Sequence, residues 1–399
     1  MSIVRKVTED LYWVGVNDKR LHLFENVHPI PRGVSYNSYL LMDEKTVLFD
    51  TVDWSGCREF LENVREVLSG RTLDYLIINH MEPDHAASIE EVLIRYPECK
   101  VISNEKSFMF MHQFGFDVEG RKEEVKEGDT KNFGKHTVTF VAAPMVHWPE
   151  AMVTFDTTDG VLFSGDGFGC FGTVDGGFLD TRINLDKYWG EMVRYYSNIV
   201  GKYGSPVQKA LQKLGGLPIS AICSTHGPVW TENIARVIGI YDRLSRYDAD
   251  EGVVIAYGSM YGNTEQMAEA IAEELSAQGI KNIVMHNVAK SHPSYIIADI
   301  FRYKGLIIGS PTYSNQIFPE VESLLSKILV REVKGRYLGY FGSFAWAGAA
   351  VKRMAEFAEK SKFELVGDPV EMKQAMRDIT YTQCENLAHA MAERLKKDR

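Results

Sequence analysis

The chain has 399 residues and a mass of 45.1 kDa, the size of two or three ordinary domains. Apolar residues make up 45% and charged residues 25%, which excludes a disordered or low-complexity chain. The 44 basic and 54 acidic side chains give a net charge of -10. A nucleic-acid-binding protein normally presents a basic face, so this class is a poor match.

The sequence also argues against a membrane or secreted protein. No apolar run reaches the ~18 residues of a membrane-spanning helix. The N-terminal residues carry charges where a signal peptide needs an apolar core. The five cysteines are dispersed without a C-x-x-C pair, which argues against a disulfide framework, a thiolate metal site, and an iron–sulfur or rubredoxin-type domain within this sequence. We therefore expect a cytoplasmic protein.

The first part of the chain begins with extended segments and later alternates strands with helices. Apolar runs predict strands over 11–16, 34–42, 46–50, 74–78, 136–143, 152–156 and 160–165. Strands that first come in runs and then alternate with helices indicate layered α/β sheets. A charged stretch around 241–252 follows a helical pattern, and we place a domain boundary there, giving domains 1–248 and 249–399.

The second part alternates strictly between strands and helices. The predicted strands are 253–257, 282–288, 305–310 and 337–343, and the predicted helices are 264–278, 294–302, 319–329, 348–361 and 382–396. Short apolar strands separated by amphipathic helices indicate an open, parallel, doubly wound sheet. Its length suits five strands.

The loop after the first of these strands has the chemistry of an anion cradle. Ser259, Asn263 and Thr264 provide side-chain donors where a helix begins, and a helix N-terminus favours an anion. The loop lacks both the lysine of a P-loop and the G-x-G-x-x-G spacing of dinucleotide folds. Neutral donors suit a phosphate monoester such as that of FMN. An ordinary N-cap is the alternative explanation of this loop alone.

Two later loops favour the flavin. They are 309–315 and 342–348, and each combines a large aromatic residue, Tyr313 or Trp346, with small residues. Ligands of a doubly wound sheet bind beyond the carboxyl ends of its strands. The expected flavin contacts are Ser259, Met260, Tyr261, Gly262, Asn263, Thr264, Pro311, Thr312, Tyr313, Asn315, Ser343, Phe344, Ala345, Trp346, Ala347 and Gly348.

With these loops, residues 252–399 resemble a flavodoxin domain. The resemblance implies non-covalent FMN and electron transfer. The first loop departs from the family at Tyr261, where a serine or threonine is usual.

The first part contains a dense group of metal-capable side chains in the segment His80-Met81-Glu82-Pro83-Asp84-His85, directly after a predicted strand. In extended backbone, His80 and Glu82 point to the same side. Pro83 ends the strand, so a turn can send Asp84 and His85 to a second position nearby. An isolated pair of such residues would more often be a capped turn.

Three later residues are candidates to complete this group. His147, Asp166 and His226 each follow a strand-like run and have glycine or proline nearby. Taken singly, each could be a core or loop residue. Together with the first segment, their spacing resembles the metallo-β-lactamase fold over residues 1–248, which implies an αββα sandwich.

Glu82 marks the departure from the hydrolases of that fold, because it stands where the H-x-H-x-D-H pattern has its second histidine. By family correspondence, one metal takes His80, Glu82 and His147, the other takes Asp84, His85 and His226, and Asp166 bridges the two metals. Imidazoles mixed with carboxylates suit iron better than zinc. His85 could instead hold a carboxylate or a water. Tyr195, Tyr196 and His22 are further candidates near the site.

The two parts together resemble the flavodiiron protein family over essentially the whole chain. The resemblance implies FMN, two non-haem irons, and reduction of dioxygen to water or of nitric oxide to nitrous oxide. It also implies a head-to-tail homodimer or a dimer of dimers, and a separate rubredoxin or reduced deazaflavin as electron donor. The alternatives are a zinc-dependent hydrolase with an appended flavodoxin domain, and an electron carrier whose first domain is structural.

Overall fold

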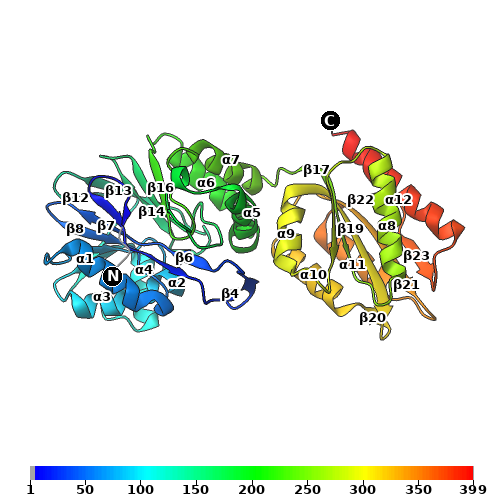
Figure 1. Ribbon diagram of the computed structural model, residues 1–399, viewed down its shortest axis with the longest axis horizontal. Coiled ribbons are helices and arrows are strands. Elements are labelled where there is room, and N and C mark those ends of the chain that lie inside the picture. The colour runs from blue at the N-terminus through cyan, green and yellow to red at the C-terminus, as the bar shows by residue number, and fades with distance from the viewer. Residues whose placement is uncertain (1–4, 399) are drawn as a thin grey trace. The chain divides into compact units, whose positions relative to one another are not determined.

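The computed structural model describes residues 5–398, which form two compact units (Figure 1). Unit 1 runs to Tyr196 and resumes over Tyr203–Ser245. Unit 2 comprises Ser197–Lys202 and the chain from Arg246 onward. Within the described residues, the structure has no helix long and apolar enough to cross a membrane.

Unit 1 is built on two main sheets. The first has the order β1 (Arg5–Lys6), β2 (Leu11–Trp13), β7 (Tyr39–Met42), β8 (Thr46–Phe49), β9 (Tyr75–Ile77), β10 (Lys100–Ser103) and β11 (Lys122–Glu124). The second has the order β12 (Thr130–Asn132), β13 (Thr137–Ala142), β14 (Met152–Asp156), β15 (Val161–Gly165) and β16 (Ala221–Ser224). Two small two-stranded sheets lie outside them: β3 (Val16–Asp18) with β6 (Val34–Tyr36), and β4 (Leu23–Phe24) with β5 (His28–Pro29).

The two sheets of unit 1 share one apolar core. Phe49 of the first sheet stacks on Phe163 of the second, with ring centroids 3.6 Å apart. Helices cover the outer faces: α1 (Cys57–Leu68), α3 (Ile89–Arg95) and α4 (Glu105–Phe114) on one side, and α5 (Asp186–Tyr195), α6 (Gly204–Leu214) and α7 (Ile234–Ser245) on the other (Figure 1). This arrangement confirms the predicted αββα sandwich.

Two predicted strands of unit 1 are interrupted. The segment 34–42 divides into β6 and β7 because the Asn37 side chain receives a hydrogen bond from Trp13 Nε1 (2.9 Å) and donates to the carbonyls of Ser224 and Gly227 (both 2.9 Å). The segment 11–16 breaks near Gly15, where the backbone of Tyr36 and Asn37 leaves no space for a Cβ atom. These contacts tie the first strands to the loop after β16.

Unit 2 is a parallel sheet with the order β18 (Ile283–Asn287), β17 (Asp250–Tyr257), β19 (Tyr303–Tyr313), β21 (Tyr337–Phe344) and β22 (Glu364–Leu365). β23 (Val370–Lys373) also pairs with β21, so the fifth position is an interrupted strand, and β20 (Gln316–Ile317) pairs antiparallel with β19. Helices α8 (Asn263–Ala277) and α12 (Asp378–Lys396) cover one face, and α9 (Pro293–Arg302), α10 (Pro319–Val330) and α11 (Ala350–Ser361) cover the other (Figure 1). The predicted doubly wound, flavodoxin-like sheet is confirmed.

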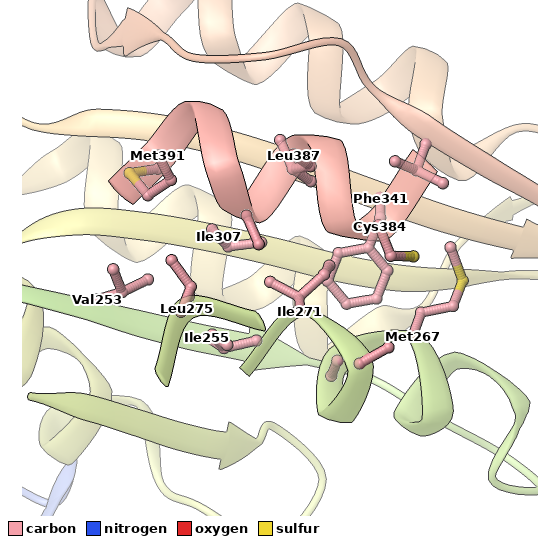
Figure 2. Close-up of a cluster of buried hydrophobic side chains, with 14 of the residues drawn as sticks. Val253, Ile255, Met267, Ile271, Leu275, Ile307, Phe341, Cys384, Leu387 and Met391 are labelled. Atoms are coloured by element: carbon pink, nitrogen blue, oxygen red, sulfur yellow. The ribbon is translucent and has the colours of Figure 1, made fainter. Parts of the chain in front are cut away.

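The core beneath α8 fixes the first loop of unit 2. Met267, Ile271 and Leu275 follow each other at intervals of four residues, so they share the helix face that is buried on the sheet. Figure 2 shows them beside strand residues and beside Cys384, Leu387 and Met391 of α12. Truncating one such fully buried leucine or isoleucine to alanine costs about 2–5 kcal/mol. The N-terminus of α8 is therefore firmly held at the end of the sheet.

Candidate metal and flavin sites

The seven metal-capable residues of unit 1 meet at one end of its sheets. His80 and Glu82 follow β9, while Asp84 and His85 lie in the short helix α2 (Pro83–Ala86). His147 lies in the loop between β13 and β14, Asp166 follows β15, and His226 follows β16. All are buried except Asp84, which is half-buried.

The Asp166 carboxylate divides the cluster into two halves. Its Oδ2 lies 3.7 Å from His80 Nε2 and 3.2 Å from His147 Nε2. Its Oδ1 lies 3.2 Å from His85 Nε2 and 3.4 Å from His226 Nε2. One carboxylate therefore faces a pair of imidazole nitrogens with each of its oxygens, the arrangement expected of a bridging group.

A second carboxylate completes each half. Glu82 Oε2 lies 2.9 Å from His147 Nε2 and 3.6 Å from His80 Nε2. On the other side, Asp84 Oδ2 lies 3.0 Å from His226 Nε2, and its Oδ1 lies 3.5 Å from His85 Nε2. Each half thus offers two imidazole nitrogens and two carboxylates, one of which is shared.

Unpartnered buried atoms indicate that these residues fit metal ions. Within residues 5–398, Nε2 of His80, His85 and His226 and both carboxylate oxygens of Asp84 are buried without a hydrogen bond. A buried polar atom left unpaired costs about 1–3 kcal/mol, and more if it is charged. Cations in the two halves would give these atoms partners, and mixed imidazole and carboxylate ligation suits iron.

The pKa shifts in the cluster also favour the binding of cations. Burial lowers the pKa of His147, but hydrogen bonds to Asp166 and Glu82 outweigh this and raise the pKa to about 9. Burial raises the pKa of Asp166, but His85, His147 and His226 hold it well below its usual value. Asp166 is therefore ionised, and protons on the neighbouring imidazoles balance its charge until a cation replaces those protons.

The three loops predicted to bind flavin surround a cavity of about 640 Å³ in unit 2. This volume lies within the usual range of small-molecule sites. Fourteen of the predicted contacts line it: Ser259, Met260, Tyr261, Asn263, Thr264, Pro311, Thr312, Tyr313, Asn315, Ser343, Phe344, Ala345, Trp346 and Ala347. Gly262 and Gly348 do not line it, whereas Ser314, Gln374 and Ala375 do.

The loop before α8 is organised around one hydroxyl. Ser259 Oγ accepts hydrogen bonds from the backbone N–H groups of Gly262 (3.1 Å) and Glu265 (3.4 Å). Gly262 has a φ of 94°, which favours glycine, and it shapes the turn without facing the cavity. Gly348 also has a structural role, because it allows the chain to pass close to Glu371. A Cβ atom at this position would lie 2.5 Å from the Glu371 carboxylate.

Large aromatic side chains at this cavity are open to solvent. Tyr261 is 91% exposed and Trp346 is 81% exposed, and exposed apolar surface gathered in one place marks a binding site. By contrast, Thr264 and Ser343 are buried and joined by a 2.8 Å hydrogen bond between their hydroxyls. The cavity therefore combines a polar floor at the helix N-terminus with flat apolar rims, as a phosphate-bearing ring system requires.

Comparisons with known proteins agree with both sites. The family described as "ODP family beta lactamase" matches residues 34–227, and the flavodoxin family matches residues 255–386. The chain is 32% identical over 370 residues to an anaerobic nitric oxide reductase flavorubredoxin of Escherichia coli, covering 92% of this chain and 77% of the relative. This chain belongs to the flavodiiron protein family.

Solved structures support the same assignment over the whole chain. The rubredoxin oxygen:oxidoreductase of Desulfovibrio gigas has 30% identity and a TM-score of 0.94, with 99% of each chain covered. A flavo di-iron protein of Thermotoga maritima has 25% identity and a TM-score of 0.90, again with 99% of each chain covered. The family expected from the sequence is confirmed, and its members pair FMN with a non-haem diiron site.

In this flavodiiron protein, a second layer of residues holds the cluster. Glu150 Oε1 lies 2.6 Å from His80 Nδ1 and accepts the backbone N–H of Met81 (2.9 Å). The Ser35 carbonyl lies 2.9 Å from His226 Nδ1, and the Thr225 hydroxyl donates to Asp166 Oδ1 (2.5 Å). Such partners leave each Nε2 free to ligate. Local spacing in the sequence does not reveal these residues, because they lie far along the chain from the ligands that they contact.

The three further candidates from the sequence lie at different distances from the metal cluster. Tyr195 is buried with its ring 5.7 Å from that of His226, and Tyr196 packs on Tyr241 at 5.0 Å. His22 is exposed and does not join the cluster. Nothing in the local sequence singles out Glu25, whose carboxyl group interacts with Glu82. Burial, and secondly the charge of Glu82, raise the pKa of Glu25 to about 8.

Proposed function

We propose that this chain passes electrons from FMN to a non-haem diiron site and reduces dioxygen to water, nitric oxide to nitrous oxide, or both. The observation that carries the proposal is the shared Asp166 carboxylate, with two imidazole nitrogens facing each of its oxygens. The similarity to a nitric oxide reductase and to a rubredoxin oxygen:oxidoreductase supports both gases as substrates.

The proposed ligands follow the two halves of the cluster. One iron would be held by His80, Glu82 and His147, the other by Asp84, His85 and His226, with Asp166 between them. Irons held by these residues would bind a small substrate and would supply an electron each. Hard carboxylate oxygens also stabilise the oxidised form of the metal. A zinc hydrolase does not need this property, because zinc does not change its oxidation state. The hydrolase alternative therefore gains no support from the ligand set.

The protein side chains provide orientation and charge. Glu150 accepts the Nδ1 proton of His80, which directs the opposite nitrogen into the site. The Ser35 carbonyl does the same for His226. Thr225 donates to the Asp166 oxygen that faces His85 and His226, so this carboxylate cannot turn away from either half. A fixed ligand geometry lowers the cost of changing the metal charge during turnover.

The flavin would lie in the 640 Å³ cavity of unit 2. Ser259, Asn263 and Thr264 would hold its phosphate at the N-terminus of α8. Tyr313 and Trp346 would flank the ring. A reduced flavin carries two electrons and a reduced iron pair carries two more, the four that one dioxygen requires.

Electron supply and assembly belong to the same proposal. We expect a separate rubredoxin as donor, supported by the name of the Desulfovibrio gigas protein, with reduced deazaflavin as the alternative. We also propose a head-to-tail homodimer or a dimer of dimers. The solvent-exposed Tyr261 and Trp346 at the flavin cavity support a covering partner surface. The cytoplasmic location stays a prediction.

Stopped-flow mixing of the anaerobically reduced protein with each gas tests this function. We expect flavin reoxidation coupled to gas consumption, with about four electrons used per dioxygen and no release of hydrogen peroxide. Hydrogen peroxide formed in proportion to the dioxygen consumed, together with no consumption of nitric oxide, would contradict the proposal.

A further inference from the structure

A second cavity lies behind the metal ligands of unit 1. It has a volume of about 30 Å³ and is enclosed by helix α6, the loop between β13 and β14, and the loop after β15. The buried residues His80 and Asp166 line part of it. We call it the α6 cavity. The hairpin of β4 and β5 does not line this cavity. Glu25, in the turn of that hairpin, interacts with Glu82 instead.

The walls of the α6 cavity are apolar. Val207, Ala210 and Leu211 of α6 face Ala143 and Val146 of the loop between β13 and β14. The rings of Phe168 and Tyr241 also line it and pack together, with centroids 4.8 Å apart. Ala210 has a small side chain beside the larger Val207 and Leu211, which leaves space next to the helix.

Some polar groups of the lining residues are already engaged, whereas the Tyr241 hydroxyl and His80 Nε2 have no hydrogen bond within the described residues. Ser164 Oγ donates to the Gly167 carbonyl at 2.6 Å, and His80 Nδ1 lies 2.6 Å from Glu150. Asp166 receives the Thr225 hydroxyl and faces the histidines. A buried water needs two to four polar partners, and most of the lining side chains are apolar. Apolar cavities take ligands such as xenon.

The outer side of the cavity approaches solvent. Val146, Ala210 and Leu211 are half-buried, whereas Val207 and Ala143 are fully buried. A passage from the surface between α6 and the loop to the inner residues His80 and Asp166 would therefore be short and apolar. The cavity volume of about 30 Å³ suits a diatomic molecule.

We propose that the α6 cavity binds uncharged diatomic gas and delivers it to the metal side chains of unit 1, with Val207 and Ala210 setting its width. Dioxygen and nitric oxide are small and dissolve better in apolar surroundings than in water. The cavity therefore concentrates them beside His80 and Asp166. The delivery step rests on the proposed function, whereas the binding of an apolar ligand does not.

Xenon provides a direct probe. Crystals of the purified holoprotein are pressurised with xenon, and we expect a xenon peak in contact with Val207 and Ala210. The variant Ala210→Phe fills the cavity from a half-buried position, and Gln212→Phe adds the same side chain at an exposed position of α6 as the matched control. The peak should disappear in the first variant and persist in the second. Absence of xenon from the α6 cavity of the unmodified protein would overturn the proposal.

Kinetics test delivery. In Ala210→Phe, kcat/KM for the gas should fall roughly tenfold because access is narrowed, while the rate of FMN reduction by the donor stays unchanged. Gln212→Phe should keep both rates. Unchanged kcat/KM in Ala210→Phe with the xenon peak gone would overturn delivery through this cavity. If the protein bound xenon there but turned over neither gas, the proposed function would fail while the binding site stood.

Discussion

The two sites of this protein are built in opposite ways. The metal cluster of unit 1 gathers charged side chains in the interior, and several of their polar atoms have no hydrogen bond within the described residues. The flavin cavity of unit 2 is an open space lined by hydroxyls, backbone and exposed aromatic rings. The first site depends on charge balance, and the second depends on shape and neutral hydrogen bonds. The two should therefore respond differently to mutation and pH.

Removal of the shared carboxylate should have the largest effect. Asp166→Ala leaves both halves of the cluster without their common oxygen ligands, so we expect loss of iron and a fall in gas reduction of roughly three orders of magnitude. FMN content should not change, because the cavity of unit 2 is a separate structure. Iron analysis and an oxygen electrode measure the two results.

The exposed Asp186 provides the control, since Asp186→Ala alters a carboxylate of the same unit away from the cluster. Full activity in Asp166→Ala would remove this residue from the metal site.

The next largest effect is expected from pH, which should change iron binding more than FMN binding. The pKa of His147 is raised to about 9, so below pH 9 a proton competes with the metal for this nitrogen, and the competition grows as pH falls. We expect apparent iron affinity to drop roughly a hundredfold between pH 8 and pH 6, which is tenfold per unit for each proton displaced. Dialysis against a chelator at each pH measures the iron that remains.

FMN retention should change little between pH 8 and pH 7, because hydroxyl and amide donors do not titrate there. Equal sensitivity of both cofactors would mean that unfolding, and not proton competition, causes the loss.

Loss of the Glu150 contact that orients His80 should reduce metal affinity less than loss of a ligand. Glu150→Gln weakens the contact with His80 Nδ1 while keeping the size of the side chain, so metal affinity should fall by roughly ten- to a hundredfold. Competition with a chromophoric chelator measures this affinity. Glu98→Gln, at an exposed position, should leave it unchanged. A wild-type affinity in Glu150→Gln would show that His80 is oriented by packing alone.

The smallest effect is expected at the flavin rim. Trp346→Ala removes one exposed ring from the cavity, and the loss of stacking should raise the Kd of FMN roughly tenfold. Flavin fluorescence measures the Kd. Trp54 is also exposed, at 62%, but lies in unit 1, so Trp54→Ala is the matched control. Unchanged flavin binding in Trp346→Ala would remove this residue from the site.

The same contrast explains what the sequence could predict. The flavin loops follow strands at the carboxyl edge of a parallel sheet, a rule that depends only on the order of elements. The segment from His80 to His85 is local and therefore visible in the sequence. Glu150 and Thr225 act on ligands that come from other loops, and only the folded chain brings them together.

Other differences come from interrupted elements. The fifth position of the unit 2 sheet is divided between β22 and β23, with Gly367 at a φ of 69° between them, so neither piece has a recognisable apolar run. Short strands such as β10 and β16 are buried on both faces and show no alternation. The segment Ser197–Lys202 packs with unit 2, where Asn198 Nδ2 donates to the Ser294 carbonyl at 3.0 Å, although its neighbours belong to unit 1.

The central claim is that a redox-active metal pair and a flavin share this chain, and the metal and flavin content of the protein purified without oxygen tests it most directly. We predict about two irons and about one FMN per chain, as the two halves around Asp166 and the single flavin cavity require. Zinc in place of iron, or flavin without any metal, would contradict the account.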